Sequence, residues 1–460
     1  MVEGRTHIPV IQADRCRHCE VCLRGCPAEL IAEYRQEPQS LRATLYRGKM
    51  KNVRAREKNL SPPCQEACPI HQDAREYTAL IARGKFSEAL EKIRKVNPLP
   101  MICGFVCHHP CEEACLREAV DHPVPLRMLK RFIAEYEKGD RTPLPKKNRK
   151  KKSRVLVVGS GPAGLAAAHD LALGGYPVTL WEALPVLGGM LAVGIPEFRL
   201  PRGGLRQEIE RIQRLGVVME TRHIFRLNGG AENLRQLGYA AVFIATGAHR
   251  SLKLRLPGED RSGIFYGVEF LRRVNLGYPL AVGKNVAVIG GGNVALDAAR
   301  SALRLGAEMV TLYYRRSRRE MPAIPEEVDQ ALHEGVKINF LVAPVKILRR
   351  GEKPSGLVLV RMQLAEPDES GRKRPLPIAG SEFRIPADTI IAAIGQRPDR
   401  RALKGLDLKP DGTVRVDSPT GATSLKGIFA GGDVVNGPGW AIEAIAAGKK
   451  AAEAIHRFLS

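Results

Sequence analysis

The sequence lacks features that several function classes require. None of its ten cysteines lies beyond residue 115, so the rest of the 460-residue chain has no thiol for a disulfide or a dithiol relay. No run of about 18 apolar residues is present, which argues against a membrane-spanning helix. The start of the chain has no basic segment followed by an apolar core, so we expect no secretory signal and a cytoplasmic protein.

Acidic residues are scarce relative to basic ones, 49 against 72, which leaves a net charge of +23. Two runs concentrate the excess, one at 42–58 and one at 141–154, where eight basic side chains occur without an acid. Such runs attract nucleic acid, anionic lipid or an acidic protein surface, or they form a solvated surface and linker. The second run has no aromatic residue on which bases could stack, so we expect no nucleic-acid partner. We expect no membrane insertion either.

The cysteines are confined to the first quarter of the chain, and this clustering favours metal ligation over disulfides. One run, followed by proline, has the spacing of bacterial ferredoxins, in which three cysteines hold one [4Fe–4S] cluster and the fourth reaches another. This run consists of Cys16, Cys19, Cys22 and Cys26. The other six are spaced mostly four apart, which places neighbours on one face of a helix. They are Cys64, Cys68, Cys103, Cys107, Cys111 and Cys115.

Zinc is the alternative metal, since His18, His108 and His109 lie near cysteines in the sequence. Structural zinc sites, however, usually use two CxxC-like pairs separated by a dozen or more residues. The tight run that ends at Cys26 and proline therefore favours iron–sulfur clusters, more firmly there than in the second set.

The pattern of apolar residues along the chain changes near residue 150. Before it, apolar residues recur at helical spacing over 73–96 and 126–136. After it, apolar strands end in glycine turns, and a strand–turn–helix–strand unit occurs twice, at 154–182 and 285–316. The repeat predicts two nucleotide-binding βαβ folds behind a mainly helical region.

The first glycine turn follows an apolar strand at 155–158. Its glycines permit a tight turn, the approach of a pyrophosphate to the backbone and close packing of helix on strand. The helix N-terminus then faces the phosphates, and an acid that ends the next strand can accept hydrogen bonds from a ribose. The candidate binding residues are Gly159, Gly161, Pro162, Ala163, Gly164 and the acid Glu182.

The second glycine turn has the same context but a different strand end. Its second strand ends in Arg315 and Arg316 rather than in an acid. An acid there would repel a 2′-phosphate, whereas arginines can pair with one, so the pattern favours NADPH over NADH. The other candidate residues of this turn are Gly290, Gly292, Asn293 and Ala295.

Two further segments suit a flavin and a domain crossing. A short apolar strand delivers Gly432 and Asp433 to a helix start, where the carboxylate could bind the hydroxyls of a ribityl chain. Thr246 and Gly247 follow the strand at 241–244 and indicate a crossing between two domains. The candidate cofactor-binding set is completed by Gly189, Met190, Gly395 and Ala441.

From about Cys64 to its end, the chain resembles the small subunit of bacterial glutamate synthase and the N-terminal half of dihydropyrimidine dehydrogenase. The motifs that carry the resemblance occur in the family's order. They are PCQEACP at 63–69, NPLPMICGFVC at 97–107, VGSGPAGL at 158–165, GGM at 188–190, GIPEF at 194–198, YRR at 314–316, EMPA at 320–323 and AGGD at 430–433.

The resemblance implies FAD in the first dinucleotide fold and NAD(P)H in the second, which would be inserted within the first. It also implies two [4Fe–4S] clusters in the helical region. Cys64 and Cys115 would serve one cluster, and Cys68, Cys107 and Cys111 the other. Cys103 matches a family cysteine that need not be a ligand.

The sequence departs from the family's pattern in two places. Arg56 and Asn59 stand where the family usually has a CxxC pair, and Lys130 stands near the family's glutamine-type ligand. A protonated lysine is no ligand, so both clusters lack ligands. The run from Cys16 to Cys26 either supplies them or holds a cluster of its own, which makes two clusters the expectation and three the alternative.

We therefore expect an α/β protein with two Rossmann-like domains, the second inserted in the first, behind a mainly α-helical iron–sulfur domain. The expected segments are a ferredoxin-like segment (1–60), the helical domain (61–140), a basic linker (141–153), the FAD-binding domain (154–250 and 381–460) and the NAD(P)H-binding domain (251–380).

The expected function is NAD(P)H-dependent electron transfer through FAD and the clusters to or from a partner subunit. An acidic surface or another iron–sulfur protein would suit that partner, and the direction of electron flow stays open. No side-chain acid or base is required for hydride transfer, so we name no catalytic residue. The alternatives are a stand-alone NADPH:ferredoxin-type reductase and a zinc-stabilised basic binding protein with a dinucleotide-sensing core.

Overall fold

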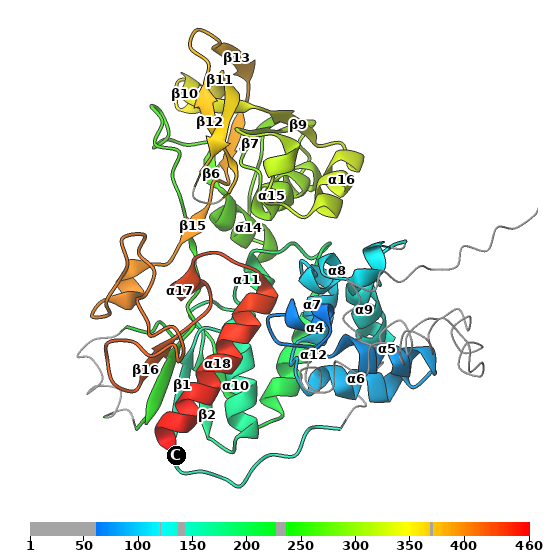
Figure 1. The fold of residues 1–460 in the computed structure, drawn as a ribbon. Coiled ribbons are helices and arrows are strands. Elements are labelled where there is room, and N and C mark those ends of the chain that lie inside the picture. Colours follow the sequence, from blue (N-terminus) through cyan, green and yellow to red (C-terminus); the bar gives the residue numbers. More distant parts are fainter. Residues whose placement is uncertain (1–60, 120, 137–142, 227–235, 237, 369–370) are drawn as a thin grey trace, which may run out of the picture. The chain divides into compact units, whose positions relative to one another are not determined.

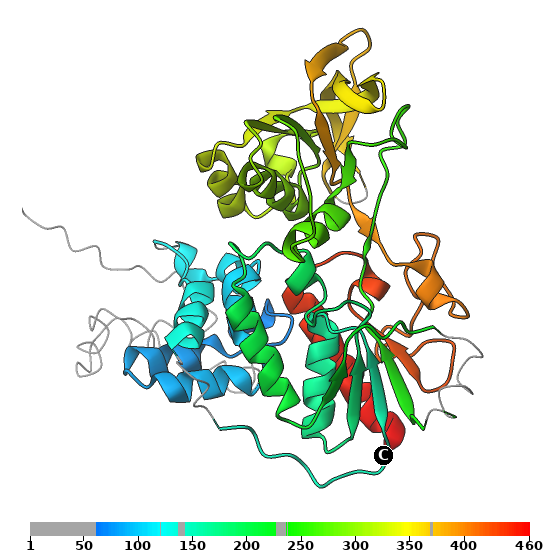
Figure 2. The same ribbon diagram turned by 180° about the vertical axis from the view of Figure 1, so that it is seen from behind.

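A computed structural model describes residues 61–119, 121–136, 143–226, 236, 238–368 and 371–460 (Figures 1 and 2). The chain divides into two compact units, Met1–Leu144 and Pro145–Ser460, which are described separately below. The predicted ferredoxin-like segment, with Cys16, Cys19, Cys22 and Cys26, lies outside the described residues. Within the described ranges, no helix is long and apolar enough to cross a membrane.

The described part of the first unit is helical, as its sequence periodicity predicts. The spacing over 73–96 forms two helices rather than one, because the chain turns at Gly84, whose φ is +71°. Tyr77, Leu90, Ile93 and Ile133 form its buried core. The helices are α4 (Pro63–Glu66), α5 (Ala74–Ala82), α6 (Phe86–Arg94), α7 (Pro100–Val106), α8 (Pro110–Glu113), the 3-10 helix η1 (Leu116–Ala119) and α9 (Leu126–Tyr136).

The second unit contains two parallel sheets, and each belongs to one domain. The sheet of the first domain has the strand order β16-β4-β1-β2-β3, in which β1 is central and its neighbours are parallel to it. These strands are β1 (Val155–Val158), β2 (Val178–Trp181), β3 (Val218–Glu220), β4 (Ala241–Ile244) and β16 (Ile428–Ala430). The helices are α10 (Pro162–Leu173), α11 (Met190–Val193), α12 (Arg202–Gln213), α17 (Asp433–Asn436) and α18 (Ala441–Leu459).

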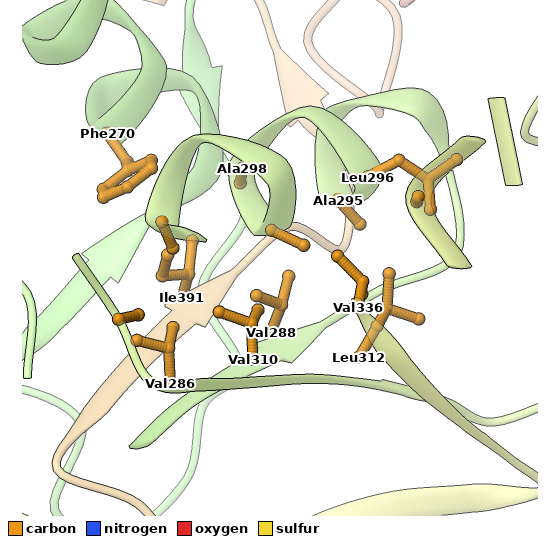
Figure 3. Close-up of a cluster of buried hydrophobic side chains, with 14 of the residues drawn as sticks. Phe270, Val286, Val288, Ala295, Leu296, Ala298, Val310, Leu312, Val336 and Ile391 are labelled. Carbon is orange, nitrogen blue, oxygen red and sulfur yellow. The ribbon is translucent and has the colours of Figure 1, made fainter. Parts of the chain in front are cut away.

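The second domain lies in the chain between the two parts of the first. Its parallel sheet has the order β6-β14-β7-β8-β9. The strands are β6 (Ile264–Tyr266), β7 (Asn285–Ile289), β8 (Met309–Tyr314), β9 (Lys337–Phe340) and β14 (Thr389–Ala392), and the helices are α14 (Gly267–Asn275), α15 (Asn293–Arg304), η2 (Arg318–Glu320) and α16 (Pro325–His333). Figure 3 shows Ala295 and Ala298 of α15 facing Val288 and Val310 of this sheet.

An antiparallel sheet extends the second domain. The long strand β11 (Lys353–Pro367) pairs with β10 (Val342–Arg350), β12 (Lys373–Pro377) and β13 (Phe383–Pro386). The chain then returns to the parallel sheet, where β14 pairs with β6 and β7. The second domain therefore continues to Ala392, beyond the boundary expected at residue 380, because β14 is buried between two of its strands.

Two extended crossings join the domains. They are β5 (Arg250–Ser251) and β15 (Gln396–Arg397), which pair antiparallel, and the amide of Leu252 donates to the carbonyl of Gly395 over 2.9 Å. Part of the expected basic linker is also ordered on the first domain, where the amides of Asn148 and Lys151 donate to the carbonyls of Leu173 and Gly175.

Candidate cofactor sites

In the first glycine turn, two glycines lie against neighbouring backbone with no room for a β-carbon, and a third has free space around it. At Gly159, with φ of +104°, a β-carbon would lie 2.4 Å from the Ala245 carbonyl oxygen, and at Gly164 it would lie 1.9 Å from that of Gly159. At Gly161, directly before α10, a β-carbon would meet nothing within 4 Å. The turn thus packs tightly against β4 and against itself while exposing amides at the N-terminus of α10, which fits a pyrophosphate.

Glu182, at the end of β2, organises the same turn. One carboxylate oxygen accepts from the amide of Ser160 over 2.9 Å and from its hydroxyl over 2.5 Å, and the other accepts from the amide of Leu184 over 2.8 Å. The Ser160 hydroxyl in turn accepts from the amide of Gly188 over 2.9 Å. Ser160 was not among the binding residues predicted from the sequence, although it stands between two motif glycines. Glu182 keeps lone pairs for a ribose, but its three bonds show that it also holds the turn together.

Several candidate residues from distant parts of the chain meet at this turn. A β-carbon on Gly189, which precedes Met190 and α11, would lie 2.8 Å from the α-carbon of Gly161. One on Gly432 would lie 3.0 Å from the side chain of Ala163, beside Pro162 at the start of α10. The amide of Thr246 lies 3.2 Å from the position of a β-carbon on Gly159.

Asp433 begins the short helix α17 in a partly buried position. Burial and, to a smaller extent, the nearby charge of Glu443 raise the pKa of its carboxyl to about 7, although the Gly439 amide donates to Asp433. Glu443 caps α18, which begins at Ala441, because its carboxylate accepts from the amide of Trp440 over 3.0 Å. A partly buried carboxyl with one weak donor suits a ligand that brings hydroxyl groups.

Two of the candidate cofactor-binding residues, Gly247 and Gly395, lie away from this turn. Gly247 follows Thr246 towards the crossing strands, and Gly395 lies in the other crossing beside Leu252.

His249 lies in the same region and was not predicted from the sequence. Burial and the adjacent Arg272 lower its pKa to about 4, and the guanidinium of Arg272 donates to its ring nitrogen over 3.1 Å.

The second glycine turn repeats the geometry of the first. A β-carbon on Gly290 would lie 2.3 Å from the Ala393 carbonyl oxygen and 3.2 Å from the side chain of Ala295, whereas one on Gly292 would meet only the side chain of Pro322, at 3.9 Å. Asn293 begins α15, and its side-chain oxygen accepts from the Ile324 amide over 3.2 Å. The turn fits a second pyrophosphate at the N-terminus of α15.

The arginines after β8 have different environments. Arg316 is buried and donates to the carbonyl of Lys373 over 2.7 Å and to the carboxylate of Asp368, so most of its guanidinium is engaged within the domain. Arg315 is exposed, and desolvation followed by the charges of Arg316 and Arg372 lowers its pKa. A bound anion would relieve this repulsion, so Arg315 is the better placed of the two predicted arginines for a 2′-phosphate.

The three cysteines assigned to one cluster, Cys68, Cys107 and Cys111, all interact electrostatically with one buried cation, Lys130. Lys130 on α9 is 6% exposed, and although burial opposes it, the thiols of Cys103, Cys107, Cys68 and Cys111 raise its pKa. Burial raises the pKa of the Cys111 thiol to about 12, against the effect of Lys130. The raised pKa keeps Lys130 a buried ammonium beside the thiols, and an ammonium offers no lone pair to a metal.

The two cysteines assigned to the other cluster are Cys64 and Cys115, and Cys111 packs against the same core as Cys64. Cys64 packs in the core beside Tyr77, whose pKa is raised by burial and by Cys111, Cys64 and Cys68, while Cys115 is partly exposed. Within the described ranges, no group of three or more His, Cys, Asp or Glu side chains is arranged to hold a metal ion. Soft thiolates suit a cluster.

Comparison with known proteins decides the family. The family model for pyridine nucleotide-disulphide oxidoreductase matches residues 153–448, and the model for dihydropyrimidine dehydrogenase domain II, 4Fe-4S cluster, matches residues 54–142. The glutamate synthase (NADPH) small chain of Escherichia coli is 34% identical over 87% of this chain and 89% of its own length. This chain belongs to that family. This membership confirms the predicted family and fold class.

Two other relatives are more similar in sequence but longer. The NADP(+)-dependent formate dehydrogenase subunit beta of Moorella thermoacetica is 45% identical over 87% of this chain and 60% of its own length. The NADPH-Fe(3+) oxidoreductase subunit beta of Geobacter sulfurreducens is 43% identical over 86% of this chain and 63% of its own length. The chain therefore spans about three fifths of these relatives.

Solved structures show the same fold at low identity. Mycobacterium tuberculosis FprA in complex with NADPH has a TM-score of 0.58 at 20% identity, covering 67% of this chain and 85% of its own. Thioredoxin reductase of T. acidophilum has a TM-score of 0.50 at 22% identity, covering 66% and 99%. The matched region of this chain contains no cysteine, so a dithiol relay within it is excluded.

Proposed function

We propose that this chain exchanges electrons between NADPH, bound by its second domain, and a partner subunit, through FAD in its first domain and [4Fe–4S] clusters held by its cysteines. One observation carries the proposal: the two domains with nucleotide turns contain no thiol, whereas the helical unit gathers buried thiols around Lys130. Electrons that reach a flavin here cannot leave through a local dithiol, so the cysteine set is the exit.

The chain's own residues would bind and orient the cofactors. The turn at Gly161 and the start of α10 would hold the FAD pyrophosphate, and Glu182 and Asp433 would accept from its hydroxyls. The turn at Gly292 and the start of α15 would hold the NADPH pyrophosphate, with Arg315 on the 2′-phosphate. Bound FAD supplies the conversion between hydride transfer and single-electron transfer.

In the helical unit, Cys68, Cys107 and Cys111 would ligate one cluster, and Cys64 and Cys115 another. Lys130 would offset the negative charge of the first cluster. The names of the relatives support a partner subunit, since two of them are beta subunits and one is a small chain. An acidic or iron–sulfur partner surface would suit the basic chain.

The test is an anaerobic titration of the purified chain with NADPH, with iron, sulfide and flavin measured in the same sample. We expect one FAD per chain, two clusters, and flavin bleaching followed by a reduced-cluster signal in electron paramagnetic resonance. A colourless zinc protein would refute the proposal. A chain that purifies without a stoichiometric partner and reduces a small ferredoxin would indicate the stand-alone reductase instead.

A further inference from the structure

Besides their crossing strands, the two domains of the second unit are in contact through α11 and α14. At the crossings, β5 pairs with β15, and Arg272 of α14 donates to His249. Beside them, the side-chain amide of Asn275, at the end of α14, donates to the carbonyl of Val193 in α11 over 2.9 Å. A two-stranded crossing with two residues in each strand leaves the domains free to change their relative angle unless another contact holds them.

That contact is made by the segment between α11 and α12. Arg199 reaches from the first domain to acids on two helices of the second, with its Nη1 2.7 Å from an Asp297 carboxylate oxygen on α15 and its Nε 3.0 Å from one of Glu327 on α16. The side chains of Arg199 and Asp297 are only 7% and 4% exposed. The planar guanidinium donates one directed hydrogen bond to Asp297 and forms an ion pair with Glu327, so it ties the first domain to both helices.

The pairing continues within the second domain. Arg300 bonds Glu327 over 2.7 Å and Glu334 over 2.7 Å, and Arg304 bonds Glu334 over 2.7 Å. We call these six residues the interdomain ion network: Arg199, Asp297, Arg300, Arg304, Glu327 and Glu334. It balances three positive against three negative charges, and Arg199 is the member that the first domain contributes.

A stacked ring accompanies the network. Phe198, the neighbour of Arg199, lies under the guanidinium groups of Arg304 at 3.9 Å and Arg300 at 4.7 Å from its ring centre. Next to it, a cavity of about 680 Å³ separates the domains, lined by Phe198 and Leu205 on one side and Leu276 and Arg304 on the other. The domain faces are thus not packed together around this cavity, where the network and its ring hold them in addition to the Asn275–Val193 bond.

We propose that Arg199 is a positioning residue, which holds α15 and the nucleotide turn at its N-terminus at the angle to the first domain that hydride transfer between NADPH and FAD requires. This inference rests on the proposed function. Asp297 lies one turn inside α15 from Asn293, so the same rigid helix joins the ion pair to the dinucleotide turn. Hydride transfer needs the reacting atoms in near contact, so a small change in this angle would slow it strongly.

The test compares Arg199→Met and Arg199→Lys with the parent chain, each loaded with FAD. In rapid mixing with NADPH, Arg199→Met should slow flavin reduction at least tenfold and change the apparent affinity for NADPH less than threefold. Arg199→Lys, which keeps the charge but loses the fork, should recover part of the rate. Asp297→Asn removes the partner without leaving an unpaired buried arginine, since Glu327 remains, and should slow reduction less.

The control reaction is reoxidation of dithionite-reduced flavin by ferricyanide, which needs no second domain and should be unchanged in all variants. The control variant is Lys449→Met, which breaks an ion pair with Asp170 inside the first domain and should leave flavin reduction unchanged. Equal rates for the parent chain and Arg199→Met would refute the inference, as would equal losses in both half-reactions. A parent chain whose flavin NADPH does not reduce would refute the proposed function instead.

Discussion

Replacing Asp433 by asparagine should stabilise the flavin-free protein at alkaline pH. Burial and Glu443 hold the pKa of Asp433 at about 7, against 3.8 for a free aspartate. The folded chain therefore keeps this proton over a pH range in which the unfolded chain has lost it. The contribution is fully present below about pH 4 and is lost as the pH rises through 7.

The size of the effect follows from the shift. A displacement of this size corresponds to at most about 4 kcal/mol, at 1.36 kcal/mol for each pH unit. Because the Asp433 side chain is partly exposed, we expect about half of that, roughly 2 kcal/mol. For a unit of this size, that is about 4 °C in melting temperature.

The assay is thermal unfolding of the flavin-free chain at pH 4 and pH 8, monitored by circular dichroism. The melting temperature of Asp433→Asn should exceed that of the parent chain at pH 8 and equal it at pH 4. Asp170→Asn is the control of opposite sign, because a hydrogen bond from His169 and the charge of Lys449 outweigh burial and lower the pKa of Asp170. The melting temperature of Asp170→Asn should therefore be lower than that of the parent chain at pH 8. The reasoning would be contradicted if the difference in melting temperature between the parent chain and Asp433→Asn did not change with pH.

Three further predictions concern the cofactors. Arg315→Glu should weaken NADPH binding at least tenfold more than NADH binding in equilibrium titrations, a difference of about 1.4 kcal/mol. Arg316→Glu should instead lower the melting temperature, because it removes the buried bonds of Arg316 to Asp368 and to the Lys373 carbonyl and places a negative charge beside Asp368. Lys130→Met should lower the midpoint potential of one cluster by roughly 50–100 mV in a redox titration, since a charge near the thiolates is removed. Gly164→Ala should abolish FAD retention on gel filtration, because its β-carbon would overlap the Gly159 carbonyl oxygen.

The features readable from the sequence are those set by neighbours in the chain. The two glycine turns, the strands before them and the helices after them were predictable because a tight turn and a close approach require glycine at fixed spacing. The helix at 126–136 was predictable from its apolar periodicity. The cysteine spacing favoured metal ligation, and the missing thiols beyond residue 115 excluded a dithiol relay.

Other features depended on contacts between distant segments. Arg316 follows Arg315 in sequence, yet only the antiparallel sheet, through Asp368 and the Lys373 carbonyl, engages it. The return of β14 to the second sheet likewise placed the domain boundary later than composition indicated. Local spacing carries no information on such partners, because they come from strands that lie far along the chain.

By itself, the sequence determined the two dinucleotide folds, the order of the domains and the residue types available for electron transfer, since each follows from local geometry or from composition. The tertiary structure decided which charges meet. Arg199 reaches Asp297 and Glu327 across the two domains, and Lys130 lies among four thiols, because folding buries these groups together and buried charges require partners.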